Sequence, residues 1–176
     1  MSVPTESFQE TLKKHFSLAN FRKGQREIIS AVMEKKDVLA VLPTGGGKSL
    51  CYQFPAVATG KLVIVISPLI ALMRDQVASL KRMGLAAGCL YSGQSEDEKR
   101  TLFREMSLGG SYVLYLSPER VQKEGFKKWI MGRPIALFAV DEAHCVSQWG
   151  HDFREEYTQL YVLKTLRPDV PTLALT

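Results

Sequence analysis

The stretch VLAVLPTGGGKSLCYQFPA, residues 38–56, joins an apolar run to a glycine-rich turn and then to a helix-forming segment. Glycine adopts backbone angles that other residues avoid, so Gly45, Gly46 and Gly47 allow successive amide groups to converge on one anion. The dipole of a helix that begins near Lys48 adds to this attraction. The stretch therefore predicts a strand, a phosphate-binding loop and a helix in this order, as in α/β proteins.

The loop meets the phosphate-binding pattern G-x-x-x-x-G-K-[ST] except at its first position, where Leu42 replaces glycine. In this pattern Lys48 reaches the β- and γ-phosphates of a nucleoside triphosphate such as ATP, and the Ser49 hydroxyl binds Mg²⁺. Thr44 belongs to the same loop, and we include it among the predicted nucleotide-binding residues. The alternative is an ordinary glycine-rich turn, which the position of GGGKS directly after an apolar strand disfavours.

Further apolar runs follow the glycine-rich segment, and each is unbroken rather than alternating, as in strands covered on both faces of a sheet. They are LVIVISP (62–68), YVLYLSP (112–118), LFAVDE (137–142) and TLALT (172–176). Amphipathic segments lie between them, for example residues 68–84 and residues 95–110, which open with a Ser95…Glu98 capping box. The alternation predicts one α/β domain with a mostly parallel central sheet and helices on both faces.

Parallel sheets of this kind bind ligands at the carboxyl ends of their strands, and LFAVDEAH supplies acids at such an end. Asp141 is placed to hold Mg²⁺ through water, and Glu142 to polarise the water that attacks the γ-phosphate. We expect His144 to couple the nucleotide to the next segment, although an ordinary surface histidine is the alternative. The chain has no H-E-x-x-H zinc helix, which disfavours metalloprotease chemistry.

The overall composition limits the class of protein. At 176 residues and 45% hydrophobic content, the chain has the size of one domain with a sizeable core. A net charge of +5 is a weak indication of a polyanionic partner. Its 3 cysteines lack C-x-x-C spacing, which favours reduced thiols in a cytosolic setting. No apolar stretch reaches the roughly 18 residues of a membrane span, so we expect no membrane partner.

Six segments in order resemble the first motor domain of RecQ-type DNA helicases of superfamily 2. They are FRKGQ, LPTGGGKS, SPLIALMRDQV, YLSPER, DEAHCVSQWGHDF and LALT, and they span nearly the whole chain. DEAH that continues into CVSQWGHDFR is the most specific feature, since it is not found in the RNA-directed DEAH group. The resemblance implies a RecA-like P-loop NTPase domain that uses ATP and Mg²⁺. It also implies 3′-to-5′ movement on single-stranded DNA and unwinding of duplexes in repair and recombination.

The resemblance assigns roles to residues outside the glycine loop. Arg22 and Gln25 of FRKGQ fall in an adenine-recognition motif, and a glutamine amide can pair with an adenine edge. For Gln25 the alternative is an exposed helix residue. Arg74 falls in a segment that contacts the DNA backbone, where its charge suits phosphates; packing of the other helix face in the core is compatible with this role. Ser117 and Arg120 of YLSPER fall in a similar motif.

The segment after DEAH resembles the aromatic-rich loop with which the family senses single-stranded DNA. Trp149 and Phe153 offer faces for base stacking, a contact of about 1–3 kcal/mol per base, and Arg154 suits a phosphate. Because this loop continues from the acids, a bound strand could reposition Glu142 and His144. The alternative, that the aromatics are core residues, is disfavoured by the polar residues between them.

We therefore expect residues 1–176 to be the first of two RecA-like domains of an ATP-dependent DNA helicase. The chain ends on a strand pattern, which favours a fragment whose second domain, with an arginine finger, follows residue 176. Alone, it should bind ATP and DNA weakly and unwind nothing. We expect such a protein in the cytoplasm with the nucleoid of a bacterium, or in a eukaryotic nucleus. The alternatives are a P-loop ATPase that does not act on DNA, a nucleic-acid-binding module with a vestigial loop, and an RNA helicase.

Overall fold

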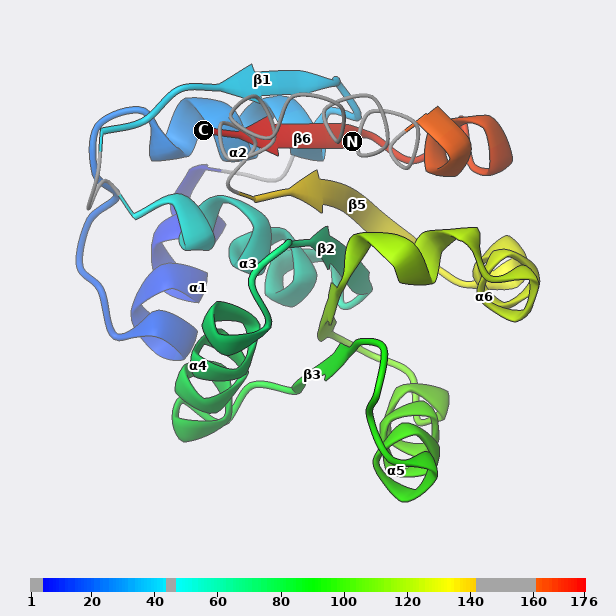
Figure 1. Ribbon diagram of the computed structural model, residues 1–176. Coiled ribbons are helices and arrows are strands. Elements are labelled where there is room, and N and C mark those ends of the chain that lie inside the picture. Colours follow the sequence, from blue (N-terminus) through cyan, green and yellow to red (C-terminus); the bar gives the residue numbers. More distant parts are fainter. Residues whose placement is uncertain (1–4, 44–46, 142–160) are drawn as a thin grey trace.

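A computed structural model describes residues 5–43, 47–141 and 161–176, and its centre is a 6-stranded sheet with the order β1-β6-β5-β2-β4-β3 (Figure 1). The strands are β1 (Val38–Ala40), β2 (Leu62–Ile66), β3 (Ala87–Leu90), β4 (Tyr112–Leu116), β5 (Ile135–Val140) and β6 (Thr172–Leu175). Every pairing among these strands is parallel. The predicted parallel α/β architecture is confirmed.

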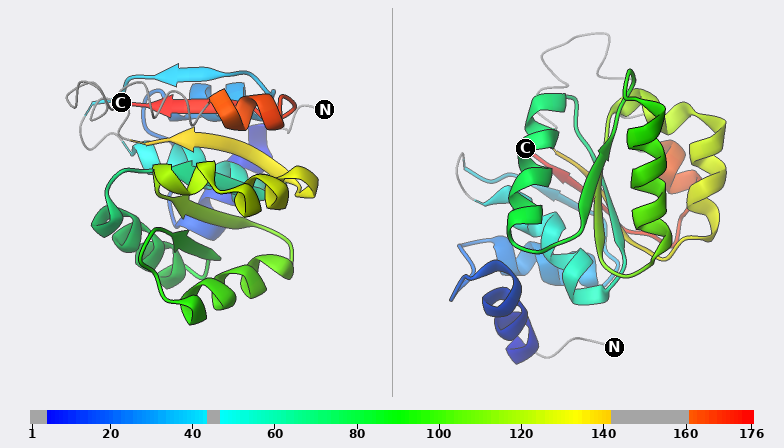
Figure 2. Two further views of the ribbon diagram at one scale, coloured as in Figure 1. Left: turned by 45° about the vertical axis from the view of Figure 1, so that its right-hand side comes forward. Right: turned by 90° about the horizontal axis from the view of Figure 1, so that it is seen from below.

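Helices cover both faces of this sheet, as predicted (Figure 2). They are α1 (Thr5–Phe16), α2 (Gln25–Met33), α3 (Lys48–Thr59), α4 (Ile70–Arg82), α5 (Glu96–Ser107) and α6 (Glu124–Trp129), the 3₁₀ helices η1 (Pro118–Gln122) and η2 (Ile130–Gly132), and a helix at residues 161–166. Helices α2, α3 and α4 lie on one face, with α1 packed against α3, whereas α5, α6 and residues 161–166 lie on the other. None of these helices is long and apolar enough to cross a membrane.

Successive residues of each central strand enter two different cores. In β2, Val63 and Val65 pack with α3 and α4, whereas Ile64 and Ile66 pack with α5 and α6. All five residues of β2 are buried, because each face of the sheet has its own layer of helices. A strand in this position has no solvent-facing side for polar residues, which explains why the apolar runs of the sequence are unbroken.

The local signals at helix ends were largely correct. The Ser95 hydroxyl accepts a hydrogen bond from the Glu98 amide at 3.2 Å, which confirms the predicted N-terminal cap of α5. Strand β3, in contrast, was not predicted. Its sequence, AGCL, is short and lacks an apolar run, and a β-carbon at Gly88 would force the ends of the Leu102 and Tyr112 side chains to move.

Asp37 joins the start of β1 to two distant elements. Its Oδ1 accepts hydrogen bonds from the Thr172 amide at 2.9 Å and from Lys164 Nζ at 3.0 Å. Partial burial alone would raise the pKa of Asp37, but these hydrogen bonds outweigh it and hold the pKa below its ordinary value. The ionised carboxylate therefore stabilises the pairing of β1 with β6.

Replacing Asp37 with alanine should lower the free energy of unfolding by about 1 kcal/mol at pH 7, a modest value because the side chain is half exposed and its charge is screened. A depressed pKa stabilises the fold above the unfolded-state pKa, near 3.8. The difference from wild type should therefore shrink as the pH falls through this value towards the lower pKa of the folded state. Urea unfolding from pH 7 to pH 3.5 measures it.

The control is Glu34→Ala, since Glu34 is a similarly exposed carboxylate whose ion-pair partner among the described residues is the exposed Lys36, at 3.0 Å. This variant should lie within about 0.5 kcal/mol of wild type, because such surface pairs contribute little. Equal effects of the two substitutions would contradict the stabilising role of Asp37.

Candidate active site

The glycine turn ends at Gly47, from which α3 begins. Gly47 has a φ of 73°, a left-handed conformation that strains any residue with a β-carbon. A β-carbon at Gly47 would also collide with Nε2 of Gln25. The predicted nucleotide-binding residues Thr44, Gly45 and Gly46 lie outside the described residues.

Leu42 continues the β1 backbone at the position where the phosphate-loop pattern has glycine. Its amide donates to the Thr176 carbonyl at 3.1 Å, and its half-buried side chain packs against the core on the α3 side of the sheet. The side chain of Leu42 also lies close to Gly24, before α2. A leucine at this position therefore contributes to core packing.

Gln25, at the start of α2, lies directly against the glycine turn. Its Nε2 donates to the Gly47 carbonyl at 3.0 Å, and its Oε1 accepts from the Arg22 amide at 2.7 Å. The residue is 3% exposed, so the alternative of an exposed helix residue is wrong. An adenine edge at Gln25 would compete with Gly47 and Arg22 for the same amide atoms, and adenine recognition stays a prediction.

Asp141 directly follows β5 and is 6% exposed. Its amide donates to the Ile66 carbonyl at 3.0 Å, and its Oδ2 accepts a hydrogen bond from the Tyr52 hydroxyl at 3.0 Å. Tyr52 lies on α3, four residues after Lys48 and three after Ser49, and residues at these spacings share one helix face. The acid after β5 and the first turn of α3 are thus joined through one buried side chain.

Tyr52 acts as the donor in this pair. Burial raises the pKa of Tyr52 well above its ordinary value, with smaller contributions from Tyr115 and Asp141. The hydroxyl therefore keeps its proton at neutral pH and can donate it to a carboxylate oxygen. Sequence reasoning did not find Tyr52, because in LCYQFPA it reads as one more apolar residue of a buried helix face.

The side-chain oxygens of Ser49 and Asp141, at this edge of the sheet, are of the kind that binds Mg²⁺. This ion binds hard oxygen ligands and usually takes one or two carboxylates together with substrate phosphates and water. Ser49 provides a hydroxyl at the start of α3, and Asp141 provides a carboxylate at the end of β5. The described parts of the chain contain no group of three or more His, Cys, Asp or Glu side chains that could hold a metal ion. Binding of Mg²⁺ at this edge would therefore also need phosphate oxygens from the substrate. Glu142 and His144 lie outside the described residues.

A partly buried polar network connects α3 to two segments with predicted DNA-binding roles. Gln53 Nε2 donates to Gln76 Oε1 of α4 and to the Tyr115 hydroxyl of β4, both at 3.0 Å. The Tyr115 hydroxyl donates in turn to Gln76 Oε1 at 3.3 Å. Burial raises the pKa of Tyr115 to about 12, so this hydroxyl also stays protonated. Satisfied networks of this kind fix the relative positions of the elements that they join.

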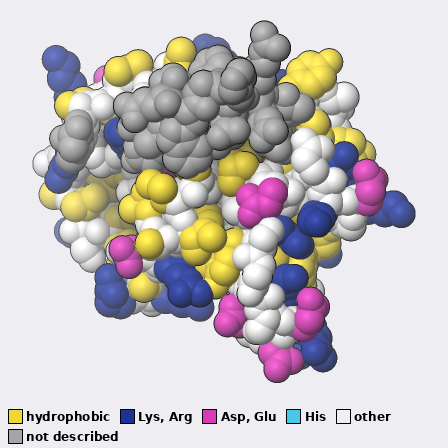
Figure 3. Space-filling view, viewed as in Figure 1, with side chains coloured by type: hydrophobic (Ala, Val, Ile, Leu, Met, Phe, Trp, Pro, Cys, Tyr) yellow, Lys and Arg dark blue, Asp and Glu magenta, His cyan; other side chains and the backbone are white. Residues whose placement is uncertain are grey.

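Arg74 is exposed on α4, where basic side chains gather (Figure 3). Its guanidinium stacks over the Tyr91 ring, 5.2 Å from the centroid, and donates to the Tyr91 hydroxyl. This hydrogen bond raises the pKa of Arg74. The residue is therefore a charged, oriented group on the surface, which is compatible with the predicted phosphate contact.

The other predicted DNA-binding residues differ in position. Ser117 is only 3% exposed, so its hydroxyl is covered by neighbouring residues. Arg120 is half-buried, and its Nε is buried without a hydrogen-bond partner among the described residues. Their phosphate contacts stay predictions. Trp149, Phe153 and Arg154 lie outside the described residues.

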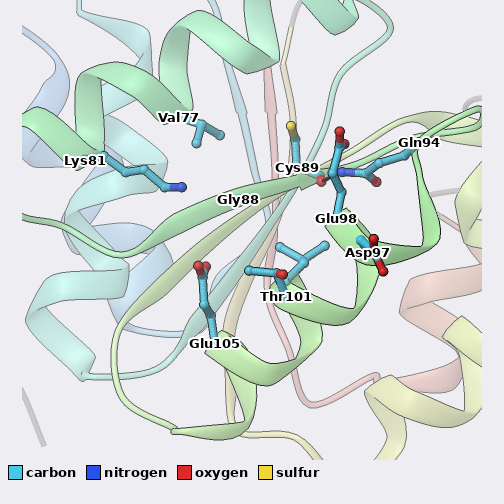
Figure 4. Close-up of a pocket in the computed structure, with 10 residues that line it drawn as sticks. Val77, Lys81, Gly88, Cys89, Gln94, Asp97, Glu98, Thr101 and Glu105 are labelled. Carbon is cyan, nitrogen blue, oxygen red and sulfur yellow. Dashed lines mark hydrogen bonds between the residues drawn. The ribbon is translucent and has the colours of Figure 1, made fainter.

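A separate hollow of about 360 Å³ opens between α4, β3 and α5 (Figure 4). Asp97, Glu98 and Glu105 line it together with Lys81, and none of the predicted site residues does. Excess negative charge at its rim disfavours a triphosphate. The start of α3 suits an anionic nucleotide better than this hollow does.

Comparison with known proteins places the chain in a family. The sequence model of DEAD/DEAH box helicases matches residues 22–176, and the chain belongs to this family. It is 48% identical to "ATP-dependent DNA helicase RecQ" of Haemophilus influenzae, over 94% of the chain and 27% of that protein. It is 42% identical to "Probable ATP-dependent DNA helicase RecS" of Bacillus subtilis, over 96% of the chain and 34% of that protein. The resemblance to RecQ-type helicases is confirmed, and the chain spans about a quarter to a third of these relatives.

Solved helicase structures have the same fold. The structure of Mycobacterium smegmatis helicase Lhr bound to ssDNA and AMP-PNP matches 96% of this chain and 24% of that chain, with a TM-score of 0.72 at 20% identity. A hypothetical ATP-dependent RNA helicase from Sulfolobus tokodaii matches 98% of this chain and 50% of that chain, with a TM-score of 0.69 at 17% identity. The RecA-like helicase fold predicted from the resemblance is confirmed.

Replacing Gly47 with alanine should lower the free energy of unfolding by more than the roughly 1–2 kcal/mol that a left-handed backbone requires, because the new methyl group also displaces Gln25. Gly60→Ala is the matched control, since Gly60 has a φ of 68° and, among the described residues beyond its chain neighbours, no atom within 4 Å of a β-carbon. Chemical denaturation measures both. Gly47→Ala should cost more unfolding free energy than Gly60→Ala, and this difference should become smaller when Gln25 is also replaced with alanine. Equal effects at the two glycines would contradict the contact.

Proposed function

We propose that this chain is the first of two RecA-like motor domains of an ATP-dependent DNA helicase. In this proposal the domain binds ATP and Mg²⁺ at the carboxyl edge of its sheet and uses hydrolysis to move along single-stranded DNA. The observation that carries the proposal is the hydrogen bond between Tyr52 and Asp141, which brings the first turn of α3 and the acid after β5 to one place. Relatives named ATP-dependent DNA helicases support the choice of DNA.

In the proposed mechanism, the backbone amides of the glycine turn and Lys48 bind the β- and γ-phosphates. Ser49 and Asp141 would hold the magnesium ion, which neutralises charge that develops on the transferred phosphoryl group. Glu142 orients the attacking water and accepts its proton. Arg22 and Gln25 recognise the adenine. Each group acts by position and charge, as phosphoryl transfer requires.

We infer that DNA binds next to this site. Arg74 would bind a phosphate, with Ser117 and Arg120 in a similar role, while Trp149 and Phe153 stack on bases. The buried hydrogen bonds from Gln53 to Gln76 and Tyr115 support a mechanical connection between α3 and the DNA-binding segments.

In this proposal, catalysis also depends on a second domain of the same protein. A second RecA-like domain would provide an arginine finger, a contribution of about 10³–10⁵ in turnover. The resemblance to RecQ-type helicases favours 3′-to-5′ movement and work in DNA repair and recombination. Such a protein acts where DNA is, in the bacterial nucleoid or the eukaryotic nucleus.

In the full-length protein, Trp149→Ala should reduce stimulation of ATP hydrolysis by single-stranded DNA by about 5-fold or more, since loss of a stacked base removes about 1–3 kcal/mol of binding. Hydrolysis without DNA should be unchanged, because the residue is not expected to contact the nucleotide. The control is Tyr161→Ala, which removes an aromatic ring that is exposed on the surface. Steady-state ATPase assays with and without single-stranded DNA measure the effect, and undiminished stimulation of Trp149→Ala would refute the sensor role.

The same assay separates the competing functions. Single-stranded DNA should stimulate the wild-type ATPase far more than RNA of the same length does. Equal or stronger stimulation by RNA would favour the RNA helicase alternative. Absence of stimulation by either polymer would favour a P-loop ATPase with another substrate. The isolated 176 residues should bind nucleotide, hydrolyse it slowly and unwind nothing, so robust unwinding by them would contradict the two-domain proposal.

A further inference from the structure

We propose that Tyr52 is a positioning residue for the magnesium-binding carboxylate, and that its hydroxyl fixes the orientation in which Asp141 approaches the nucleotide. The inference rests on the proposed function, because it gives a role to a residue that acts through Asp141. The Tyr52 hydroxyl donates to Oδ2 of Asp141 at 3.0 Å, and Tyr52 is fully buried. The bond joins residues that are 89 positions apart in the sequence.

The tyrosine ring is held rigidly, so its hydroxyl does not move with the carboxylate. Tyr52 lies in the interior of α3 and belongs to the core between the sheet and α3. Its ring meets the Tyr115 ring edge-on, with centroids 6.0 Å apart at an interplanar angle of 80°. Rotation of Tyr52 would open a cavity in a close-packed core, which is strongly unfavourable.

The same helix carries the predicted phosphate and metal ligands. Lys48 and Ser49 form the first turn of α3, and Tyr52 follows in the next turn on the same face. One rigid helix therefore sets the distance between the Ser49 hydroxyl and the hydroxyl that holds Asp141. The two residues that would hold the magnesium ion, Ser49 directly and Asp141 through water, are then both positioned from α3, although Asp141 itself follows β5.

Orientation of this kind affects metal binding directly. Carboxylates that bind metals are commonly held by hydrogen bonds from neighbouring groups, and loss of such a partner typically lowers metal affinity or activity about 10–100-fold. Without the Tyr52 hydroxyl, Asp141 would lose one of the contacts that orient its carboxylate, so the side chain would be held less strictly for the metal. The effect should therefore appear in the dependence on Mg²⁺ and not in nucleotide binding without the metal.

Tyr52→Phe tests the proposal because it removes one oxygen and keeps the ring. Tyr112→Phe is the matched control: Tyr112 is also buried, and its hydroxyl also donates to a carboxylate at 3.0 Å, but that carboxylate belongs to Glu105 on α5. The two variants in the full-length protein should be similarly stable. Thermal melting checks this, so that a difference in metal dependence is not a difference in folding.

The measurement is binding of a fluorescent ATP analogue to the full-length protein across a Mg²⁺ titration and in EDTA. For Tyr52→Phe, the Mg²⁺ concentration at half-maximal enhancement should rise about 10-fold or more. Binding in EDTA should match wild type, and Tyr112→Phe should match wild type in both conditions. A Tyr52→Phe curve equal to that of wild type, or an equal loss with and without Mg²⁺, would overturn the positioning role.

Asp141→Asn separates failure of this inference from failure of the proposed function. If Asp141→Asn removes the Mg²⁺ enhancement and Tyr52→Phe does not shift it, the role of Tyr52 fails while the site stands. If Asp141→Asn leaves the enhancement intact, the metal assignment itself fails and the role of Tyr52 fails with it. If Asp141→Asn removes the Mg²⁺ enhancement and Tyr52→Phe raises the Mg²⁺ concentration at half-maximal enhancement, both the metal assignment and the role of Tyr52 are supported.

Discussion

The hydrogen bond between the Tyr52 hydroxyl and the Asp141 carboxylate is the interaction on which the site depends. It joins α3, which begins at the glycine turn, to the end of β5 at the carboxyl edge of the sheet. A carboxylate that is 6% exposed needs polar partners, because a buried charge without them is strongly destabilising. The fold satisfies this requirement with a residue of the helix that carries the predicted phosphate ligands, so packing and function share one contact.

The parallel sheet makes this arrangement possible. Every strand among the described residues runs in the same direction, so the turn after β1 and the acid after β5 emerge at one edge. Two helical layers bury the strands on both faces and leave the strand ends as the place for polar groups. The network of Gln53, Gln76 and Tyr115 crosses the interface between α3, α4 and β4 within one of these layers. These hydrogen bonds join α3 to α4, the helix that carries Arg74.

The sequence predicted the parts of this structure that depend on local signals. Glycine conformations, unbroken apolar runs and the Ser95 cap are properties of neighbouring residues. The left-handed Gly47 before α3, the strands and α5 are present as expected. The position of Asp141 at the same edge of the sheet as the glycine turn was predicted, because parallel strands have their carboxyl ends at one edge. Strand β3 was missed because AGCL has no apolar run, whereas its pairing partner β4 lies more than 20 residues further along the chain. The burial of Gln25 and the role of Tyr52 were missed for a related reason: their partners are 22 and 89 residues away.

A crystal structure of the full-length protein with Mg²⁺ and a non-hydrolysable ATP analogue tests the central claim most directly. The account predicts one magnesium ion between the β- and γ-phosphates, bound by the Ser49 hydroxyl at about 2.0–2.1 Å and linked to Asp141 through water. The Tyr52 hydroxyl should still donate to the Asp141 carboxylate in that complex. A nucleotide bound away from the first turn of α3, or a magnesium ion out of reach of Asp141, would contradict the account.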